Sequence, residues 1–247
     1  RMSFGLECGN EEFRAKVLLR PLKNGILTEK FKIIAEAGIP FSINNIIGFP
    51  NETYKQIQDT ISVANQMALD WYNVGILQPL PNTPIFDSMV EEGLIDTEKM
   101  EFSDIRYNTG GLGKHKQQKR DMLSVNFSEA FKVSDLNTVP DRAKLDDIWA
   151  YMNYHLNFKK LFKENRKTKL IQKAKYVENI TDLVSPENCL AIYFQGYLEH
   201  KIFGKIKEKT IKNLENRLEK YSYWKERFEQ YNLSPEHLKT QNFNIDD

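Results

Sequence analysis

Residues 2–9, MSFGLECG, end an apolar run in a polar turn that contains glycine. The same pattern recurs in NNIIGFPNET at residues 44–53 and, with prolines in the turn, in QPLPNTP at residues 78–84. A helix-like stretch follows each turn, and this alternation is typical of parallel strands connected by helices. In such folds ligands bind at the carboxyl ends of the strands, so we expect functional residues at these three turns.

The helices between these turns have recognisable ends. Asn10 is the expected N-cap of the first helix, Thr28 of the second and Thr53 of the third, and Gly38 ends the second. Strands are expected over three apolar runs, residues 2–7, 41–49 and 71–80. The last of these is apolar on both sides, as in parallel strands covered by helices. The first part of the chain therefore predicts an α/β fold.

Composition sets wide limits on function. The 247 residues carry a formal net charge of +1, so the whole-chain charge gives no argument for a nucleic acid or an acidic membrane surface. The two cysteines, Cys8 and Cys189, form no CxxC pair, which argues against a disulfide framework and a zinc site. No apolar run approaches the roughly 18 residues of a membrane span, and no segment resembles a signal peptide. These features predict a cytoplasmic protein.

The pattern changes after about residue 100, where helical periodicity replaces the alternation of strand and helix. One apolar stripe contains Ile148, Tyr151 and Met152, and a stripe of this kind usually packs a core of its own. We therefore expect three regions: the α/β part at residues 1–100, a linker at 101–120, and a helical extension at 121–247.

Four polar residues in the first part are candidates for binding. Glu7 ends an apolar strand, and it is either a solvated strand end or an acceptor for ribose hydroxyls or an ammonium group. Arg20 is either a surface residue or a partner for a carboxylate at the same strand end. Asn44 and Asn45 interrupt an apolar strand, and one of them should face a polar cavity because a buried amide without partners is costly.

Several common sites are absent from the sequence. GGLGKH at residues 110–115 lacks the first glycine and the Ser or Thr of a phosphate-binding loop. There is no GxSxG turn of a hydrolase. The four histidines have no metal-ligand spacing, and His155 on an apolar stripe is expected in the core.

Together the three turns resemble radical S-adenosylmethionine enzymes. GLECGNEEFRAKVLLR (5–20) resembles the fourth-strand segment of that family, NNIIGFPNET the fifth strand and its turn, and GILQPLPNTPIFDSMVEEGLI (75–95) the sixth strand with its proline turn. NEEFR after the glutamate is similar to the subgroup in which a cobalamin-binding domain precedes the barrel. The resemblance implies the second half of a (β/α)6 partial TIM-like barrel with parallel strands, followed by a mainly α-helical C-terminal region.

The resemblance also implies a binding site for S-adenosylmethionine. Glu7 would contact the ribose or the methionyl amine, Arg20 the methionyl carboxylate, and Asn44 the ribose. The adenine would lie in a site that Gly48 leaves open and that Leu77 and Gln78 line.

Two residues depart from the family pattern within these motifs. Cys8 stands where serine is common, and Asn82 replaces the usual glycine of the PGTP turn. A hydroxyl contact and the geometry of that turn are therefore in question.

The largest departure concerns the iron–sulfur cluster. Members of the family hold a [4Fe-4S] cluster with a CxxxCxxC motif at the end of the first barrel strand, and the cluster supplies the electron that cleaves the cofactor to a 5'-deoxyadenosyl radical. This sequence has no such motif, and two distant cysteines cannot ligate a cluster. We therefore expect the cluster ligands in a missing N-terminal half of the chain, with no catalytic or metal residues here and no activity alone.

The resemblance leaves the substrate and reaction open, while it implies a reductant such as flavodoxin or ferredoxin, and cobalamin as a further cofactor. Two alternatives come from other classes. One is a non-catalytic α/β module that binds a nucleotide or a protein partner. The other is a fragment that binds or modifies nucleic acid through lysines which, with Glu208 and Glu215 between them, otherwise form an ordinary solvated helix face: Lys201, Lys205, Lys207, Lys209 and Lys212.

Overall fold

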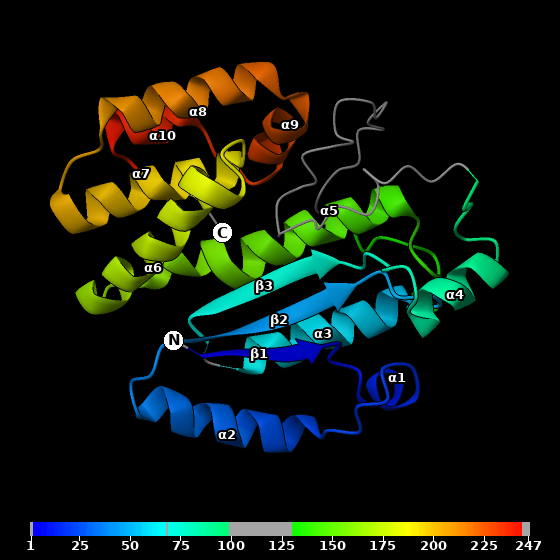
Figure 1. Cartoon of the computed structure of the whole chain (residues 1–247). Coiled ribbons are helices and arrows are strands. Elements are labelled where there is room, and N and C mark those ends of the chain that lie inside the picture. The colour runs from blue at the N-terminus through cyan, green and yellow to red at the C-terminus, as the bar shows by residue number, and fades with distance from the viewer. Residues whose placement is uncertain (1, 68, 99–129, 244–247) are drawn as a thin grey trace.

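A three-stranded parallel sheet organises the first part of the protein (Figure 1). The computed structural model describes residues 2–67, 69–98 and 130–243. The strands are β1 (Met2–Glu7), β2 (Phe41–Ile47) and β3 (Trp71–Ile76). They pair in the order β1-β2-β3, so their carboxyl ends share one end of the sheet. The expected α/β class with parallel strands is confirmed.

Helices α2 (Asn24–Glu36) and α3 (Tyr54–Gln66) cover the outer face of this sheet. The short helices α1 (Glu11–Lys16) and α4 (Pro84–Glu91) lie beyond the carboxyl ends of the strands. Phe31 of α2 packs on Phe4 of β1 and Phe41 of β2, with ring centroids 5.2 and 5.4 Å apart. Tyr72 of β3 donates its hydroxyl to the carbonyl of Ala64 in α3 at 2.9 Å. Alternate strand residues therefore bury one face under α2 and α3.

Two of the three predicted N-caps are confirmed. Asn10 accepts a hydrogen bond from Phe13 N at 2.8 Å, and Thr53 forms a capping box with Gln56. The prediction for Thr28 is wrong, because α2 begins one turn earlier at Asn24, whose backbone N–H is held by Glu11 Oε1 at 2.7 Å. Thr28 lies inside the helix.

The second half of the protein is helical, as expected. α5 (Arg142–Asn153) continues through a π-helical turn η4 (Tyr154–Phe158) and a 3-10 turn η5 (Lys159–Lys163). α6 (Lys167–Asn179) ends in a π-helical turn η6 (Ile180–Val184). The remaining helices are α7 (Cys189–Phe203), α8 (Glu208–Lys220), α9 (Ser222–Gln230) and α10 (Pro235–Thr240). The linker expected at residues 101–120 lies outside the described residues.

Side chains of the helical half close the outer edge of β3. Asn157 accepts a hydrogen bond from Tyr72 N at 2.9 Å and donates one to Tyr72 O at 2.8 Å. Trp149 Nε1 donates to Val74 O at 2.7 Å. These bonds satisfy backbone groups that would otherwise pair with a further strand, so the sheet ends at β3. At the other edge, within the described residues, β1 pairs only with β2.

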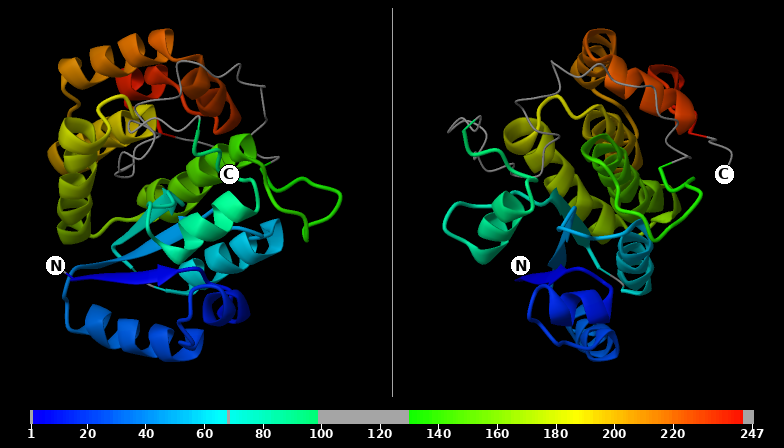
Figure 2. Two further views of the ribbon diagram at one scale, coloured as in Figure 1. Left: turned by 45° about the vertical axis from the view of Figure 1, so that its right-hand side comes forward. Right: turned by 90° about the vertical axis from the view of Figure 1, so that its right-hand side faces the viewer.

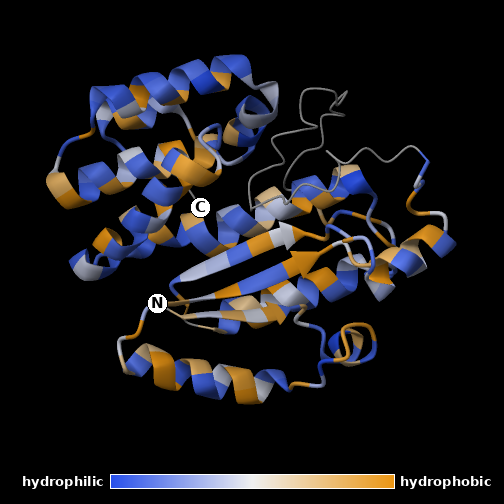
Figure 3. Ribbon diagram, viewed as in Figure 1, coloured by the Kyte–Doolittle hydropathy of each residue, from blue (hydrophilic) through white to orange (hydrophobic). Residues whose placement is uncertain are grey.

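One hydrophobic core joins the sheet to the helical half. Trp71 of β3 lies edge-on to Phe158 of η4 and stacks on Tyr176 of α6 at 5.2 Å. α7 is apolar around most of its circumference and is buried between its neighbours, whereas α8 is hydrophilic along most of its length (Figures 2 and 3). In the part of the chain that the structure describes, no helix is long and apolar enough to cross a membrane.

Candidate functional site

The inner face of the sheet, turned away from α2 and α3, is polar. Gly5, Asn44 and Asn73 stand side by side in one row across the strands. Asn73 Nδ2 donates to Asn44 Oδ1 at 2.7 Å, and Ser3 Oγ donates to the same oxygen at 3.4 Å. As expected for one of the two asparagines, Asn44 belongs to a polar face. Asn45 points to the opposite face, is 1% exposed, and its amide has no hydrogen-bond partner among the described residues.

Glu7 and Arg20 form an ion pair above this row. Glu7 Oε1 and Arg20 Nη1 are 3.1 Å apart, and the two side chains keep 20% and 50% of their surface exposed. A Cβ atom at Gly5 would overlap the Glu7 carboxylate and lie 3.2 Å from Arg20 Nη1. Because Gly5 pairs with Asn44, the ion pair and the amide row share the inner face. The missing side chain at Gly5 thus leaves the space in which the Glu7–Arg20 pair lies over β1.

The backbone of Glu7 is in an unusual conformation. Its φ is +62°, in the left-handed region that side chains other than Asn and Gly rarely adopt, and the register shifts between Gly5 and Glu7. Burial raises the pKa of Glu7 above its ordinary value, and the Arg20 guanidinium opposes this shift. Strain of this kind concentrates at functional sites because the surrounding structure must hold it in place.

The residues expected around an adenine lie near the carboxyl ends of the strands. Leu77 packs with a small cluster of Cys8, Phe13 and Phe49, and Gln78 follows it, partly buried. Gly48 has a φ of +84°, and a Cβ atom there would lie 2.7 Å from Leu145 Cδ1 of α5. The backbone conformation and the contact with α5 therefore account for the glycine without a ligand.

Glu52 is a structural residue that the sequence did not reveal. Its side chain is fully buried, and Oε2 accepts hydrogen bonds from Gly48 N at 2.7 Å and Phe49 N at 3.3 Å. Burial raises its pKa to about 7, against the hydrogen bonds that favour the carboxylate. The residue fixes the turn after β2, and a glutamate next to an N-cap threonine gave no sign of this burial.

Arg14 fixes the turn after β1 in a similar way. The guanidinium is 2% exposed and donates to Cys8 O at 2.6 Å, to Leu22 O, and to Asn24 Oδ1 at 2.9 Å. These bonds connect the exit of β1 to the start of α2. The arginine of NEEFR therefore has a structural role, and it brings the segment that carries Arg20 close to Glu7.

Asparagines occupy left-handed backbone positions in two of the turns. Asn51 and Asn82 have φ values of +60° and +65°. Asparagine adopts the left-handed region more readily than other side chains. Thr83 follows as the N-cap of α4 and accepts a hydrogen bond from Phe86 N at 3.4 Å. Asn82 is thus the left-handed residue of the proline turn after β3.

A cavity of about 330 Å³ lies between the inner face and the helical half. Asn44 and Asn73 line it from the sheet, Asn153 from α5 and Asn179 from the end of α6. Trp71 contributes a flat aromatic wall. All of its lining residues are uncharged, so the cavity suits a neutral, polar and flat group.

The two cysteines do not form a metal site. Cys8 and Cys189 are both fully buried, and burial raises the pKa of both thiols, that of Cys8 to about 11. The part of the chain that the structure describes contains no group of three His, Cys, Asp or Glu side chains placed to hold a metal ion. His155 lies against Tyr151, with ring centroids 4.1 Å apart, and burial lowers its pKa to about 4.

The candidate site thus has two parts. Glu7, Arg20 and Asn44 share the inner face of the sheet, and Gly48 and Leu77 lie at the carboxyl ends of the strands. No protein-family model matches the chain.

Proposed function

We propose that this chain supplies part of the S-adenosylmethionine site of a radical S-adenosylmethionine enzyme. The proposal assigns its sheet to the second half of a six-stranded partial barrel. Glu7, Arg20 and Asn44 would bind the ribose and the methionyl group of the cofactor. Leu77 and Gln78 would line the adenine site, to which Gly48 would contribute only its backbone, because Leu145 occupies the space beside it.

One observation carries the proposal more than any other: the Glu7–Arg20 ion pair folded over Gly5, in register with Asn44. A carboxylate and a guanidinium side by side match the ammonium and carboxylate of an α-amino acid, because each ligand charge finds its opposite. The amides of Asn44 and Asn73 offer both donors and acceptors next to that pair. The strained backbone of Glu7 is consistent with a position selected for binding.

The chain's own residues would act on the cofactor by orientation. Glu7 would accept a hydrogen bond from the ammonium or from a ribose hydroxyl, and Arg20 would turn from Glu7 toward the methionyl carboxylate. Both side chains reach solvent, so this exchange of partners needs no unfolding of the core. Bound and reduced, the cofactor would supply the 5'-deoxyadenosyl radical that the family uses.

The cluster does not fit the residues of this chain. Its two cysteines are buried with raised thiol pKa values, whereas cluster ligands are thiolates. We place the ligands, and a strand that pairs with the free edge of β1, in protein outside these residues. A stoichiometric, redox-active cluster assembled on this chain from iron and sulfide would contradict that placement. The reductant and the cobalamin remain predictions.

Calorimetric titration with S-adenosylmethionine tests the proposal. Glu7→Gln should weaken binding by about tenfold, because a charge-assisted hydrogen bond to the ammonium contributes about 1.5–3 kcal/mol. Glu12→Gln is the matched control, since Glu12 is exposed and pairs only with Lys16 on α1 among the described residues. Equal weakening by the two variants, or no saturable binding by the unaltered chain, would contradict the proposal.

A further inference from the structure

We propose that a basic surface on η5 and α6 binds the sugar–phosphate backbone of a single-stranded nucleic acid. This basic surface is formed by Lys160, Lys163, Lys167, Lys169, Lys173 and Lys175. It begins at the amino ends of the strands, near Asp70, whereas Glu7 lies at their carboxyl ends (Figure 1). The inference shares with the proposed function only the inner-face cavity that Asn44 and Asn73 line, because the basic surface lies apart from Glu7 and Arg20.

The net charge of residues 159–175 is much more positive than that of the whole chain. Residues 159–175 contain eight lysines and arginines and a single glutamate, a net charge of +7, while all 247 residues together carry +1. The glutamate, Glu164, is held by Arg166 at 2.6 Å. A positive segment on an otherwise acidic chain is the electrostatic pattern of polyanion binding.

Three of the lysines lie around the start of β3, one on a carboxylate and two over aromatic rings. Lys169 Nζ is 2.6 Å from Asp70 Oδ1, Lys173 Nζ lies 5.7 Å from the centre of the Trp71 ring, and Lys160 lies over Tyr72. Burial lowers the pKa of Lys173 to about 8, and Lys169 and Lys160 add to that shift while Asp70 opposes it. An anion bound here would be attracted by cations that now repel one another.

The exposed side of α6 extends the basic surface. Lys167 and Lys175 are both exposed, and within the described residues neither forms an ion pair. α6 has no acidic residue in its first turn and no side-chain N-cap bond, although Arg166, Lys167 and Lys169 stand there. Cations at the amino end of a helix lower its stability. Helix formation therefore does not explain these charges.

The neighbouring cavity favours a nucleic acid over an acidic protein. A hollow of about 580 Å³ beside Ile171 and Lys175 shares two lining residues, Tyr176 and Asn179, with the inner-face cavity. The cavity offers amides and flat rings and no charge. An unpaired base needs such a surface for stacking and hydrogen bonding, while phosphates need the lysines. Acidic side chains would find no partner in the cavity.

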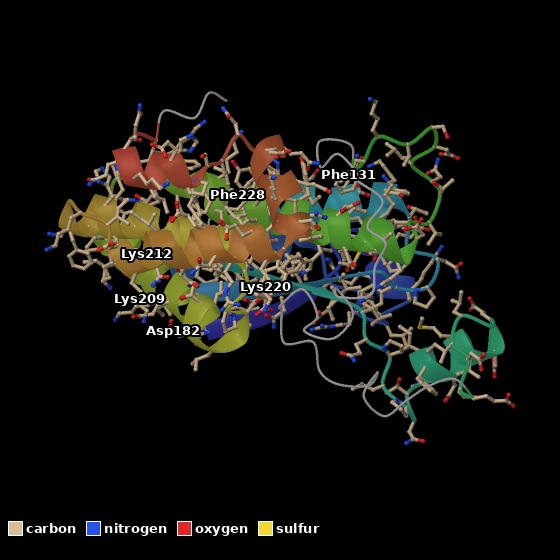
Figure 4. The ribbon with its side chains drawn as sticks, turned by 90° about the horizontal axis from the view of Figure 1, so that it is seen from above. Phe131, Asp182, Lys209, Lys212, Lys220 and Phe228 are labelled. Carbon is tan, nitrogen blue, oxygen red and sulfur yellow. The ribbon has the colours of Figure 1, made fainter. Side chains whose placement is uncertain are left out.

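Fluorescence anisotropy with short labelled RNA and DNA strands of mixed sequence tests the inference on the whole chain. The triple variant Lys163→Glu, Lys167→Glu and Lys175→Glu should lose at least about tenfold in affinity, and the salt dependence of binding should weaken by about 2 in slope. The matched control is Lys205→Glu, Lys209→Glu and Lys212→Glu, which changes three exposed lysines on α8 and in the turn before it, two of them labelled in Figure 4. Circular dichroism checks that both variants fold.

Two further probes separate the sources of binding. An abasic strand with the same phosphates should bind at least about threefold more weakly if a base enters the cavity. Poly-glutamate of matched charge should compete poorly with the labelled strands for the basic surface. Binding of RNA alone, or of RNA and DNA alike, supports the inference. Equal losses in the two triple variants, full competition by poly-glutamate, or no binding of either strand at low salt would overturn it.

Discussion

Gly5 determines whether Glu7 and Arg20 can meet above the strand. A methyl group there would occupy the place of the Glu7 carboxylate, so the Glu7 side chain would have to move away from its position beside Arg20. Glu7 in turn holds a left-handed backbone that its side chain does not favour. Gly5 and Glu7, two positions apart in MSFGLE, thus depart from the usual preferences of a strand, and we take this as evidence of a binding site.

Gly5→Ala should therefore lower the affinity for S-adenosylmethionine by about tenfold or more while the fold persists, because displacing the ion pair removes charge-assisted contacts. Gly25→Ala is the matched control. No atom lies within 4 Å of the Cβ position at Gly25, so that change should add about 0.5–1 kcal/mol of helix stability and leave binding unaltered. Calorimetric titration and thermal unfolding measure both effects. Unchanged affinity in Gly5→Ala would contradict this role of the ion pair.

Glu52 makes stability depend on pH. Its pKa is about 7 in the folded protein, above the ordinary value of 4.5, so the folded state holds the proton more tightly than the unfolded state does. The contribution of Glu52 is complete below pH 4.5 and is lost as pH rises to about 7. Glu52→Gln should remove this loss.

Urea unfolding at about pH 4 and about pH 8, below the ordinary pKa of 4.5 and above the folded pKa of about 7, is the measurement for Glu52. We expect the unaltered chain to lose stability between the two conditions relative to Glu52→Gln, which stays neutral throughout. Glu12→Gln serves again as the control, because Glu12 is exposed at the surface of α1. Parallel pH profiles for the unaltered chain and Glu52→Gln would show that burial of the carboxylate is not the cause.

At the scale of elements, the pairing of η4 with β3 decides where the sheet stops. Asn157 imitates the backbone of a neighbouring strand by bonding both the N–H and the C=O of Tyr72. Asn157→Leu should lower the free energy of unfolding by about 2–4 kcal/mol, since it leaves two buried backbone groups without partners. Asn216→Leu, on the exposed side of α8, should change it by about 0.5 kcal/mol or less. Similar losses in both variants would rule out this edge bond as a determinant of stability.

Element boundaries differ in how well the sequence predicts them. Asn10 and Thr53 are caps that depend on residues three positions away, and both were predictable. The prediction of Thr28 as an N-cap failed because Glu11, from the preceding helix, binds the backbone N–H of Asn24, and α2 begins there. The edge bonds of Asn157 join residues 85 positions apart, and no local pattern announces them.

At the scale of the whole molecule, the candidate site could likewise be predicted only in part from the sequence. Parallel strands place the turns at one end, so the sequence predicted that Glu7 and Asn44 lie near each other. The sequence did not predict that Leu145 would fill the space beside Gly48, that Glu52 would be buried, or that the helical half would form a wall of the inner-face cavity. These features depend on contacts between the two halves of the chain, which share one core.

The most direct measurement of the central claim is a nuclear magnetic resonance titration of the isotope-labelled chain with S-adenosylmethionine. The claim predicts shifts in the backbone amide of Gly5 and the side-chain amides of Asn44 and Asn73, which stand in one row on the inner face. The side-chain amide of Asn216 on α8 should not move. Shifts confined to residues away from the inner face, or none at saturating cofactor, would contradict the claim.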